Sequence, residues 1–265
     1  MEKEMSRRKI VIYTTSDYNW AFNTWKDSLP ALLEEYDVKG VLLFPDQLGG
    51  RKGMQIPLYY LKTFGFINFI LFASFAVLQQ LRRIFSSVSS WKALAKKHNI
   101  PLLYYKNPNQ KEVIEWTQDC DPDVIVIMVS QILKKEVLSI PKLGVINKHA
   151  AILPSCRGVY PYFWAKLYGL PLGYSFHEVT EGIDKGKILY QHRVSEDSEE
   201  SLIAFYKEVY AEYKNALLAA LRNLESGEFI SPENVEDSYF SFPLRKDYKN
   251  FRNQGYRIAR LKDLF

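Results

Sequence analysis

A chain of 265 residues is long enough to bury a full hydrophobic core, as one large domain or as one domain with an appendage. Its composition, 47% hydrophobic and 25% charged with no repeat or low-complexity tract, excludes a disordered or fibrous protein. The net charge of +5 is spread along the chain in short clusters, so it suits a small anionic substrate better than a nucleic acid.

The first strands and helices are predicted by hydrophobic periodicity. Apolar β-branched runs predict strands at 9–16, 38–44, 101–105 and 123–129, and helical spacing predicts helices at 20–35, 90–98 and 109–117. The run 123–129 is apolar on both faces, as in a central strand of a parallel sheet. The alternation predicts an α/β protein with a Rossmann-like, doubly wound and mostly parallel sheet.

The turns after the first two strands lack the spacing of a nucleotide-binding loop. The first turn, SDYNWAFN, contains no glycine, which disfavours NAD. The second, DQLGGRKG at 46–53, is rich in glycine and basic but follows no phosphate-loop spacing, so an ordinary loop is the favoured interpretation.

The segment 58–78 is the most apolar part of the chain. It has 21 residues, interrupted mainly by Lys62 and Asn68 and followed by two arginines, and could just span a bilayer by length. Predicted strands on both sides argue against a span, because a crossing would divide one sheet between the two sides of the membrane. We expect a helix within 58–81, in an apolar helical insertion at 56–97, covered by protein, for which the second subunit of a homodimer is one source. A helix on the membrane surface remains an alternative.

Polar side chains appear abruptly after Val145 and Ile146, at the end of another predicted strand. On an extended strand Asn147 and His149 share one face, and Lys148 points to the other. An amide donor beside a titratable ring at a strand's carboxyl end suits carbonyl chemistry. The alternative is a strand end whose Asn and His satisfy loop backbone groups.

The remaining chain is expected to form two more strands and a long helix. The strands lie at 172–179 and 187–194, and the loop between them carries Asp184, which alone is more typical of a turn than of a catalyst. Asp197 or Ser198 is expected to cap a helix that ends near Gly227. We place a catalytic domain at 1–197 and a short helical or hairpin extension at 198–265.

Six motifs in this order and spacing resemble the folate-dependent formyltransferases, which include glycinamide ribonucleotide, methionyl-tRNA and sugar N-formyltransferases. They are Asn147-x-His149, Ile152-Leu153-Pro154, Arg157-Gly158, Pro161, Trp164-Ala165 and Gly182-x-Asp184-x-Gly186. The resemblance is strong over 123–194 and looser towards the N-terminus. It departs from the family pattern at Lys148, Ala151 and Cys156, which puts fine cofactor contacts in doubt but not the reaction class.

The resemblance implies transfer of a formyl group from N10-formyltetrahydrofolate to a primary amine, without a metal. Asn147 and protonated His149 would stabilise the negative charge on the carbonyl oxygen, and Asp184 would accept the amine proton or polarise the imidazole. It also implies that the pterin lies against Ser130, Gln131, Ile132 and Leu133 and against the loop of Thr180, Gly182 and Ile183. We assign Arg157 and Tyr160 to the substrate, because arginine can meet a pyrophosphate and tyrosine can stack on a ring.

The acceptor is expected to be a nucleotide-linked amino sugar, used in surface polysaccharide synthesis. The last 40 residues are too few for the five-stranded barrel with which a methionyl-tRNA enzyme grips tRNA. Ser241-Phe242-Pro243, followed by Phe251-Arg252-x-x-Gly255, resembles the tails of the sugar N-formyltransferases. Another amine acceptor, methionyl-tRNA or glycinamide ribonucleotide, is the first alternative, and a non-catalytic Rossmann-like binding protein is the second.

The cellular compartment is predicted from the cysteines and the N-terminus. Cys120 and Cys156 lack metal-ligand spacing and fit a reducing compartment. The N-terminal residues MEKEMSRRK are too charged for a secretory signal, so we expect a cytoplasmic protein.

Overall fold

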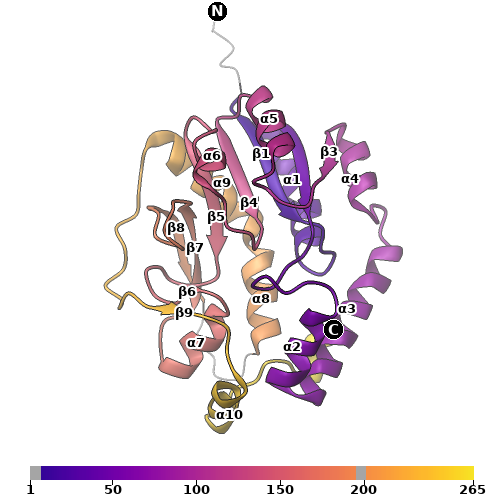
Figure 1. Cartoon of the computed structure of the whole chain (residues 1–265), viewed down its shortest axis with the longest axis vertical. Coiled ribbons are helices and arrows are strands. Elements are labelled where there is room, and N and C mark those ends of the chain that lie inside the picture. Colours follow the sequence, from indigo (N-terminus) through magenta and orange to yellow (C-terminus); the bar gives the residue numbers. More distant parts are fainter. Residues whose placement is uncertain (1–6, 195–200) are drawn as a thin grey trace, which may run out of the picture.

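The structure, a computed structural model, describes residues 7–194 and 201–265. Its centre is a seven-stranded sheet in the order β3-β2-β1-β4-β5-β7-β8 (Figure 1). The first five strands in this order are mutually parallel, whereas β7 runs antiparallel to β5 and β8 antiparallel to β7. The predicted α/β class with a mostly parallel sheet is therefore confirmed. The strands are β1 (Lys9–Thr15), β2 (Asp37–Phe44), β3 (Leu102–Tyr104), β4 (Val124–Met128), β5 (Gly144–His149), β7 (Gly173–Glu178) and β8 (Ile188–Arg193).

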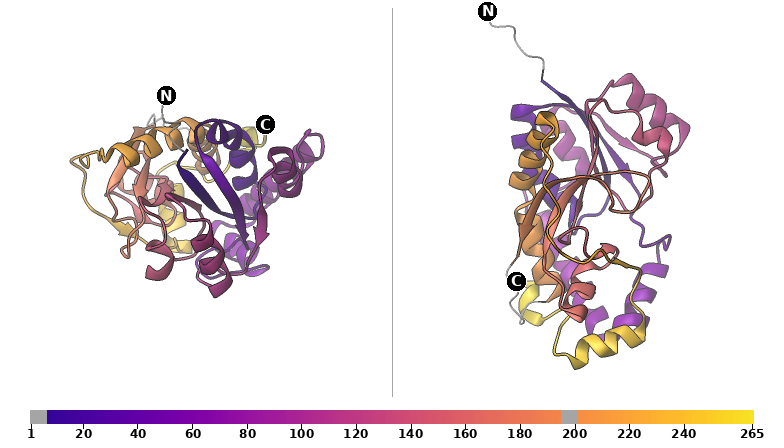
Figure 2. Two further views of the ribbon diagram at one scale, coloured as in Figure 1. Left: turned by 90° about the horizontal axis from the view of Figure 1, so that it is seen from above. Right: turned by 90° about the vertical axis from the view of Figure 1, so that its left-hand side faces the viewer.

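Successive residues of the central strands enter two different hydrophobic cores. Ile10 and Ile12 of β1 belong to one cluster, and Val11 and Tyr13 belong to the other, as the twofold periodicity of a strand requires. Helices α1 (Ala21–Glu35), α4 (Trp91–His98) and α9 (Tyr213–Ser226) cover the first face. Helices α5 (Lys111–Asp119) and α6 (Lys135–Leu138) cover the second (Figure 2). Both faces are covered, which explains why the predicted strands are almost continuously apolar.

The apolar insertion forms a pair of helices. Gly65, at φ +83°, separates α2 (Gln55–Phe64) from α3 (Phe66–Ile84), so the expectation of one helix through this segment is wrong. One face of α3 packs inward through Phe75 and Asn68, whose side-chain amide donates to the Tyr248 hydroxyl at 2.6 Å. The opposite face is exposed, so this chain alone does not provide the predicted cover. Across the described part of the chain, no helix is both long and apolar enough to cross a membrane.

The C-terminal segment contains two helices where one was expected. Helix α8 (Leu202–Ala211) begins after Ser201, which caps it, and α9 follows a break at Glu212. The expected caps, Asp197 and Ser198, lie outside the described residues. Lys148 of β5 donates to the carbonyl of Val209, which in a continuous helix would accept from the backbone of Tyr213. The break is therefore explained by a side chain of the neighbouring strand, which no helical pattern could reveal.

The tail returns to the segment that follows β5. Strand β9 (Tyr239–Phe240) pairs in parallel with β6 (Arg157–Gly158), so β9 is not an arm of the expected hairpin. The helices α7 (Pro161–Tyr168), α10 (Arg245–Asn253) and η1 (Leu261–Leu264) complete this end of the molecule (Figure 1). The larger core cluster contains residues from both sides of the predicted domain boundary at 197.

We expect the Ser201 cap to matter more than an ordinary helix cap. Its buried hydroxyl accepts from the backbone of Ala204 and donates to the buried carboxylate of Asp263. Ser201→Ala should lower the free energy of unfolding by about 2–3 kcal/mol, because the cap is lost and the carboxylate keeps fewer partners. The matched control is Ser90→Ala at the cap of α4, where the hydroxyl accepts only from the backbone of Ala93 among the described residues, and its loss should cost about 1 kcal/mol. Equal losses in urea unfolding would contradict this account.

Candidate active site

Strand β5 presents the two predicted catalytic side chains. His149 is buried, and Asn147 is partly exposed. Asn147 pairs across the antiparallel ladder with His177 of β7, and His149 pairs with Ser175. Lys148 lies on the opposite face, against the rings of Tyr210 and other tyrosines. The strand thus brings an amide and two imidazoles to one end of the sheet.

The ring of His149 is held from two directions. Its Nε2 lies 2.8 Å from the carbonyl oxygen of Cys156, and because a carbonyl can only accept, Nε2 carries the hydrogen. Its Nδ1 lies 3.6 Å from Oδ2 of Asp184. The ring therefore turns Nδ1 towards the one carboxylate of this site.

Asp184 lies between two imidazoles. Its Oδ2 accepts from the backbone N–H of Gly158 at 2.8 Å, and its Oδ1 lies 3.5 Å from Nε2 of His177. The residue has a left-handed backbone, at φ +51°. A Cβ atom on Gly186 would lie 1.8 Å from the carbonyl oxygen of Glu178, so only glycine lets the loop return this close to β7. The loop is thus shaped to place the Asp184 carboxylate.

His177 belongs to this site and was missed by the sequence reasoning. Its Nδ1 lies 2.7 Å from the carbonyl oxygen of Glu178 and therefore donates to it. Burial lowers the pKa of His177 to about 4, although Asp184 opposes the shift, so the ring is neutral at neutral pH. Its Nε2, which has no hydrogen-bond partner among the described residues, turns a lone pair towards Asp184. The sequence did contain a signal for His177, because this residue lies on a predicted strand that leads into the Asp184 loop.

The side chains gathered here can stabilise a negatively charged oxygen and accept a proton at the same site. The amide of Asn147 is a donor of the kind that binds a developing oxyanion. The lone pair of His177 and Oδ1 of Asp184 face each other at 3.5 Å, which leaves a position for a proton between two acceptors. An attacking amine must lose a proton, so the arrangement suits acyl transfer to an amine.

A buried hydroxyl fixes the loop that supports His149. Ser175 donates to the carbonyl of Ala151 at 2.7 Å and accepts from the backbone N–H of Leu153 at 3.1 Å. The backbone N–H of Cys156 donates to the Ser238 hydroxyl of the tail at 2.9 Å. The carbonyl that orients His149 is therefore anchored by both β7 and the C-terminal segment.

The predicted cofactor residues after β4 lie beside the loop that follows β2. Ser130 donates to the carbonyl of Gln47 at 2.7 Å, and Gln131 donates to that of Pro45 at 3.2 Å. Ile132 is 74% exposed, whereas Leu133 is buried in the smaller core. Leu133 can therefore contribute only its backbone, and Ile132 offers an apolar surface.

The other predicted cofactor residues lie on the Asp184 loop. Thr180 and Ile183 are exposed, and Gly182 is partly buried against Lys185. They are next to Asp184 in the chain, so a ligand held here would contact the same loop that positions its carboxylate.

The two predicted substrate residues are engaged within the chain. Arg157 donates to Asp237 at 2.7 Å and to the carbonyl of Ile183 at 3.3 Å, which ties the tail to the Asp184 loop. Tyr160 packs against aromatic rings, among them those of Phe64 and Phe242. Burial raises the pKa of its hydroxyl well above the usual value. In this conformation Arg157 positions a loop, and its direct contact with a substrate stays a prediction.

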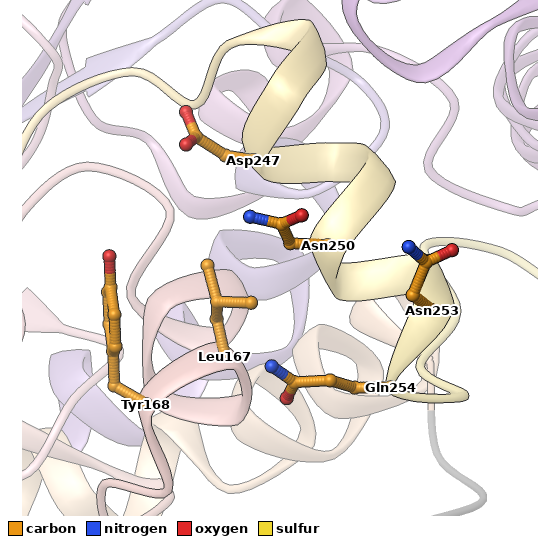
Figure 3. A pocket seen from close by; sticks show the side chains of 6 residues that line it. All are labelled: Leu167, Tyr168, Asp247, Asn250, Asn253 and Gln254. Carbon is orange, nitrogen blue, oxygen red and sulfur yellow. The ribbon is translucent and has the colours of Figure 1, made fainter.

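A hollow lies between α7 and α10 (Figure 3). Its volume is about 290 Å³, and none of the predicted site residues lines it. The described ranges contain no group of three or more His, Cys, Asp or Glu side chains placed to hold a metal ion. The lining residues of the hollow are Leu167, Tyr168, Asp247, Asn250, Asn253 and Gln254.

Comparison with known proteins decides the family. The sequence model of the family described as "Formyl transferase" matches residues 80–221, just over half of the chain. The chain belongs to the formyl transferase family. The match includes β5 and the Asp184 loop.

Individual formyl transferases are similar over parts of their length. A bifunctional polymyxin resistance protein ArnA from Wigglesworthia glossinidia brevipalpis is 35% identical over 46% of this chain and 19% of its own length. A methionyl-tRNA formyltransferase from Clostridium acetobutylicum is 35% identical over 63% of this chain and 45% of its own length. The chain thus spans less than half of either relative.

A solved structure shows the same fold. The sugar N-formyltransferase from Shewanella sp. FDAARGOS_354 superposes with a TM-score of 0.56 at 13% sequence identity. The superposition covers 88% of this chain and 77% of the other. At this identity the likeness establishes the formyl transferase fold.

We expect Asn147→Ala, His149→Ala and Asp184→Ala each to fold and to lose about a hundred- to a thousand-fold in formyl transfer. The reason is that each removes a donor or acceptor aimed at the reacting atoms. The rates should be compared with that of Glu181→Ala, which removes an exposed carboxylate from the same loop. Near-normal turnover of one variant would remove that residue from the mechanism.

We expect His177 to make the protein sensitive to acid. A histidine with a pKa near 6.5 unfolded and about 4 folded contributes its full stability above pH ~6.5 and loses it as the pH falls to ~4. The loss should approach about 3 kcal/mol, measured by urea unfolding at several pH values. His177→Gln should flatten this dependence, whereas His192→Gln, at an exposed position of β8, should not. An unchanged pH dependence in His177→Gln would contradict the neutral, buried ring.

Proposed function

We propose that this formyl transferase moves a formyl group from N10-formyltetrahydrofolate to the primary amine of a nucleotide-linked amino sugar. The observation that carries the reaction class is the convergence of Asn147, His149, His177 and Asp184 at one end of β5. These groups match the two demands of the reaction, which are stabilisation of an oxyanion and removal of a proton from nitrogen.

Each side chain is given a role in this mechanism. Asn147 donates to the carbonyl oxygen of the formyl group as charge develops on it. His149, held by Cys156, shares that task when Nδ1 is protonated. Asp184 accepts the proton of the attacking amine at Oδ1, directly or through water, because Oδ2 is already bonded to Gly158. The neutral ring of His177 then shares this proton through Nε2. From this pair of groups the proton would pass to the folate nitrogen that departs as its bond to the formyl carbon breaks, so that the formamide and tetrahydrofolate are the products.

The residues around the site fit a flat heterocycle such as the pterin. Ile132 and Ile183 expose apolar side chains on the two loops assigned to the cofactor. The buried Oε1 of Gln131 has no hydrogen-bond partner among the described residues, so it can accept from an amino group of a ring. When bound, the folate supplies the activated formyl group, and the protein supplies the oxyanion donors and the base.

The N-terminus of α1 bears on the alternative of a non-catalytic nucleotide-binding protein. The carboxylate of Asp17 accepts from the backbone N–H groups of Asn19, Trp20 and Ala21, with shortest distances of 2.6, 3.1 and 2.7 Å. The N-terminus of α1 therefore carries its own anion and does not offer the phosphate site of a dinucleotide-binding protein. A non-catalytic nucleotide-binding role is disfavoured on this ground.

Methionyl-tRNA is the second candidate acceptor, because several of the similar curated proteins are named methionyl-tRNA formyltransferases. Against it, positive charge is scattered along the sequence. The exposed ring of Tyr168 in α7 stacks against Trp164 and against Phe240 of the tail, so α7 and the tail together present an aromatic surface at this end. Such a surface suits a base or sugar ring.

The two acceptors should be distinguished by product analysis. We expect amino-sugar nucleotides incubated with formyltetrahydrofolate to gain one formyl group, detected by liquid chromatography and mass spectrometry, and the Asp184→Ala variant to give none. If methionyl-tRNA is formylated and no amino-sugar nucleotide reacts, the proposed acceptor is wrong, whereas the reaction class still holds. If no amine is formylated, the proposal that this protein catalyses formyl transfer is wrong.

Salt provides an independent test of the acceptor. Binding of tRNA releases counterions from many phosphates, so its affinity falls steeply with salt. A nucleotide sugar has only two phosphates, and we expect kcat/KM to fall by less than about tenfold between 50 and 200 mM salt. A loss of about a thousand-fold or more would favour the tRNA acceptor.

A further inference from the structure

The exposed face of the apolar insertion is too large for an ordinary monomer surface. Its nine large apolar side chains are between 37% and 88% exposed. At about 150–200 Å² for a fully exposed large apolar side chain, they present roughly 800–1,000 Å². The largest apolar patch of a typical monomer is about 300–600 Å², and one side of a standard protein interface is about 800 Å². The nine are Leu58, Leu61, Phe66, Ile67, Ile70, Val77, Leu81, Ile84 and Phe85.

The order of these residues along α3 is symmetric about the middle of the helix. The point of symmetry lies between Phe75 and Ala76, next to the middle of the helix, and three pairs of exposed large side chains stand at equal distances on either side of it. Large residues occupy both ends and small ones occupy the centre. The mirror pairs are Phe66 with Phe85, Ile67 with Ile84, and Ile70 with Leu81, and nearer the centre the half-buried Ser74 stands opposite Val77.

We propose that α3 pairs with α3 of a second copy of this chain, antiparallel and across a twofold axis near Phe75 and Ala76. Such an axis places each residue opposite its mirror partner, so the same patch serves both subunits. The small side chains of Ser74 and Val77 meet at the crossing and allow close approach. The helix lies at the periphery of the molecule, away from the sheet, where a second copy can reach it (Figures 1 and 2).

The charges around the patch favour a second copy over a membrane surface. A helix that lies on anionic lipid carries Lys and Arg beside its apolar face. Here the sequence from Thr63 to Leu81 contains no charged residue. Arg82 donates to the carbonyl oxygens of Leu264 and Phe265, and Arg83 donates to Ser89 and Gln80. These two arginines are engaged within the chain, and the exposed Lys62 beside Leu61 adds one cation, which attracts anionic lipid only weakly. An apolar partner therefore fits the patch better than lipid headgroups.

The association state tests the pairing first. The full-length protein should have the mass of two chains by light scattering at micromolar concentration. Ile70→Glu/Leu81→Glu, which sets like charges opposite each other, should weaken the dimer by about a hundred-fold or more. Ile70→Glu/Leu81→Lys, which sets opposite charges there, should restore much of the association. Tyr104→Glu is the control for an exposed residue elsewhere, on the edge strand β3.

Cross-linking tests the antiparallel direction even if the charged variants fold poorly. The backbones of packed helices lie about 8–10 Å apart, so Ile70→Cys/Leu81→Cys should be joined between subunits by a short bis-maleimide. Neither Ile70→Cys alone nor Leu81→Cys alone should be cross-linked, because the two copies of one position lie about 16 Å apart along the helices. The unsubstituted protein, treated in the same way, is the control for cross-links through the native cysteines.

Several outcomes would overturn the proposal. A single-chain mass at all concentrations would do so, and co-sedimentation of that monomer with anionic vesicles would assign the patch to a membrane. A dimer that is indifferent to Ile70→Glu/Leu81→Glu would place the interface elsewhere. Cross-linking of the single variants as efficient as that of the double variant would contradict the antiparallel arrangement.

Discussion

The placement of one carboxylate between two imidazoles is the constraint on which the site depends. Asp184 is bonded to the backbone of Gly158 and approaches His149 with one oxygen and His177 with the other. A buried carboxylate is costly unless it is paired or hydrogen-bonded, and here the backbone donor offsets that cost without using up both oxygens. One oxygen is fixed, and the other is available for a proton.

The surrounding architecture serves to bring this loop back to the sheet. A Cβ on Gly158 would lie 2.2 Å from the carbonyl oxygen of Phe240, and one on Gly186 would collide with Glu178. The two glycines allow the tail, β6 and the Asp184 loop to approach one another. Arg157 reinforces this arrangement by joining Asp237 of the tail to the carbonyl of Ile183. The C-terminal segment is thus part of the support of the active site.

The sequence was most informative where local periodicity decides the structure. Runs such as 123–129 predict buried strands because both faces are apolar, and the spacing of Asn147 and His149 follows from the twofold repeat of a strand. Long-range contacts could not be predicted in this way. The break at Glu212 depends on Lys148 from a strand more than 60 residues earlier, and the place of His177 depends on the antiparallel register with β5. The turn at Gly65 could have been suspected, since glycine is the residue most tolerant of positive φ.

The central claim is that a neutral His177 faces Asp184 and leaves its Oδ1 available as a proton acceptor. With only four histidines in the chain, nitrogen chemical shifts of the imidazoles can be assigned and followed with pH. The account predicts that His177 carries its hydrogen on Nδ1 and stays neutral from pH 7 to about pH 5. It also predicts that His149 carries its hydrogen on Nε2 when neutral. A charged His177 at pH 7, or one protonated on Nε2 alone, would contradict it.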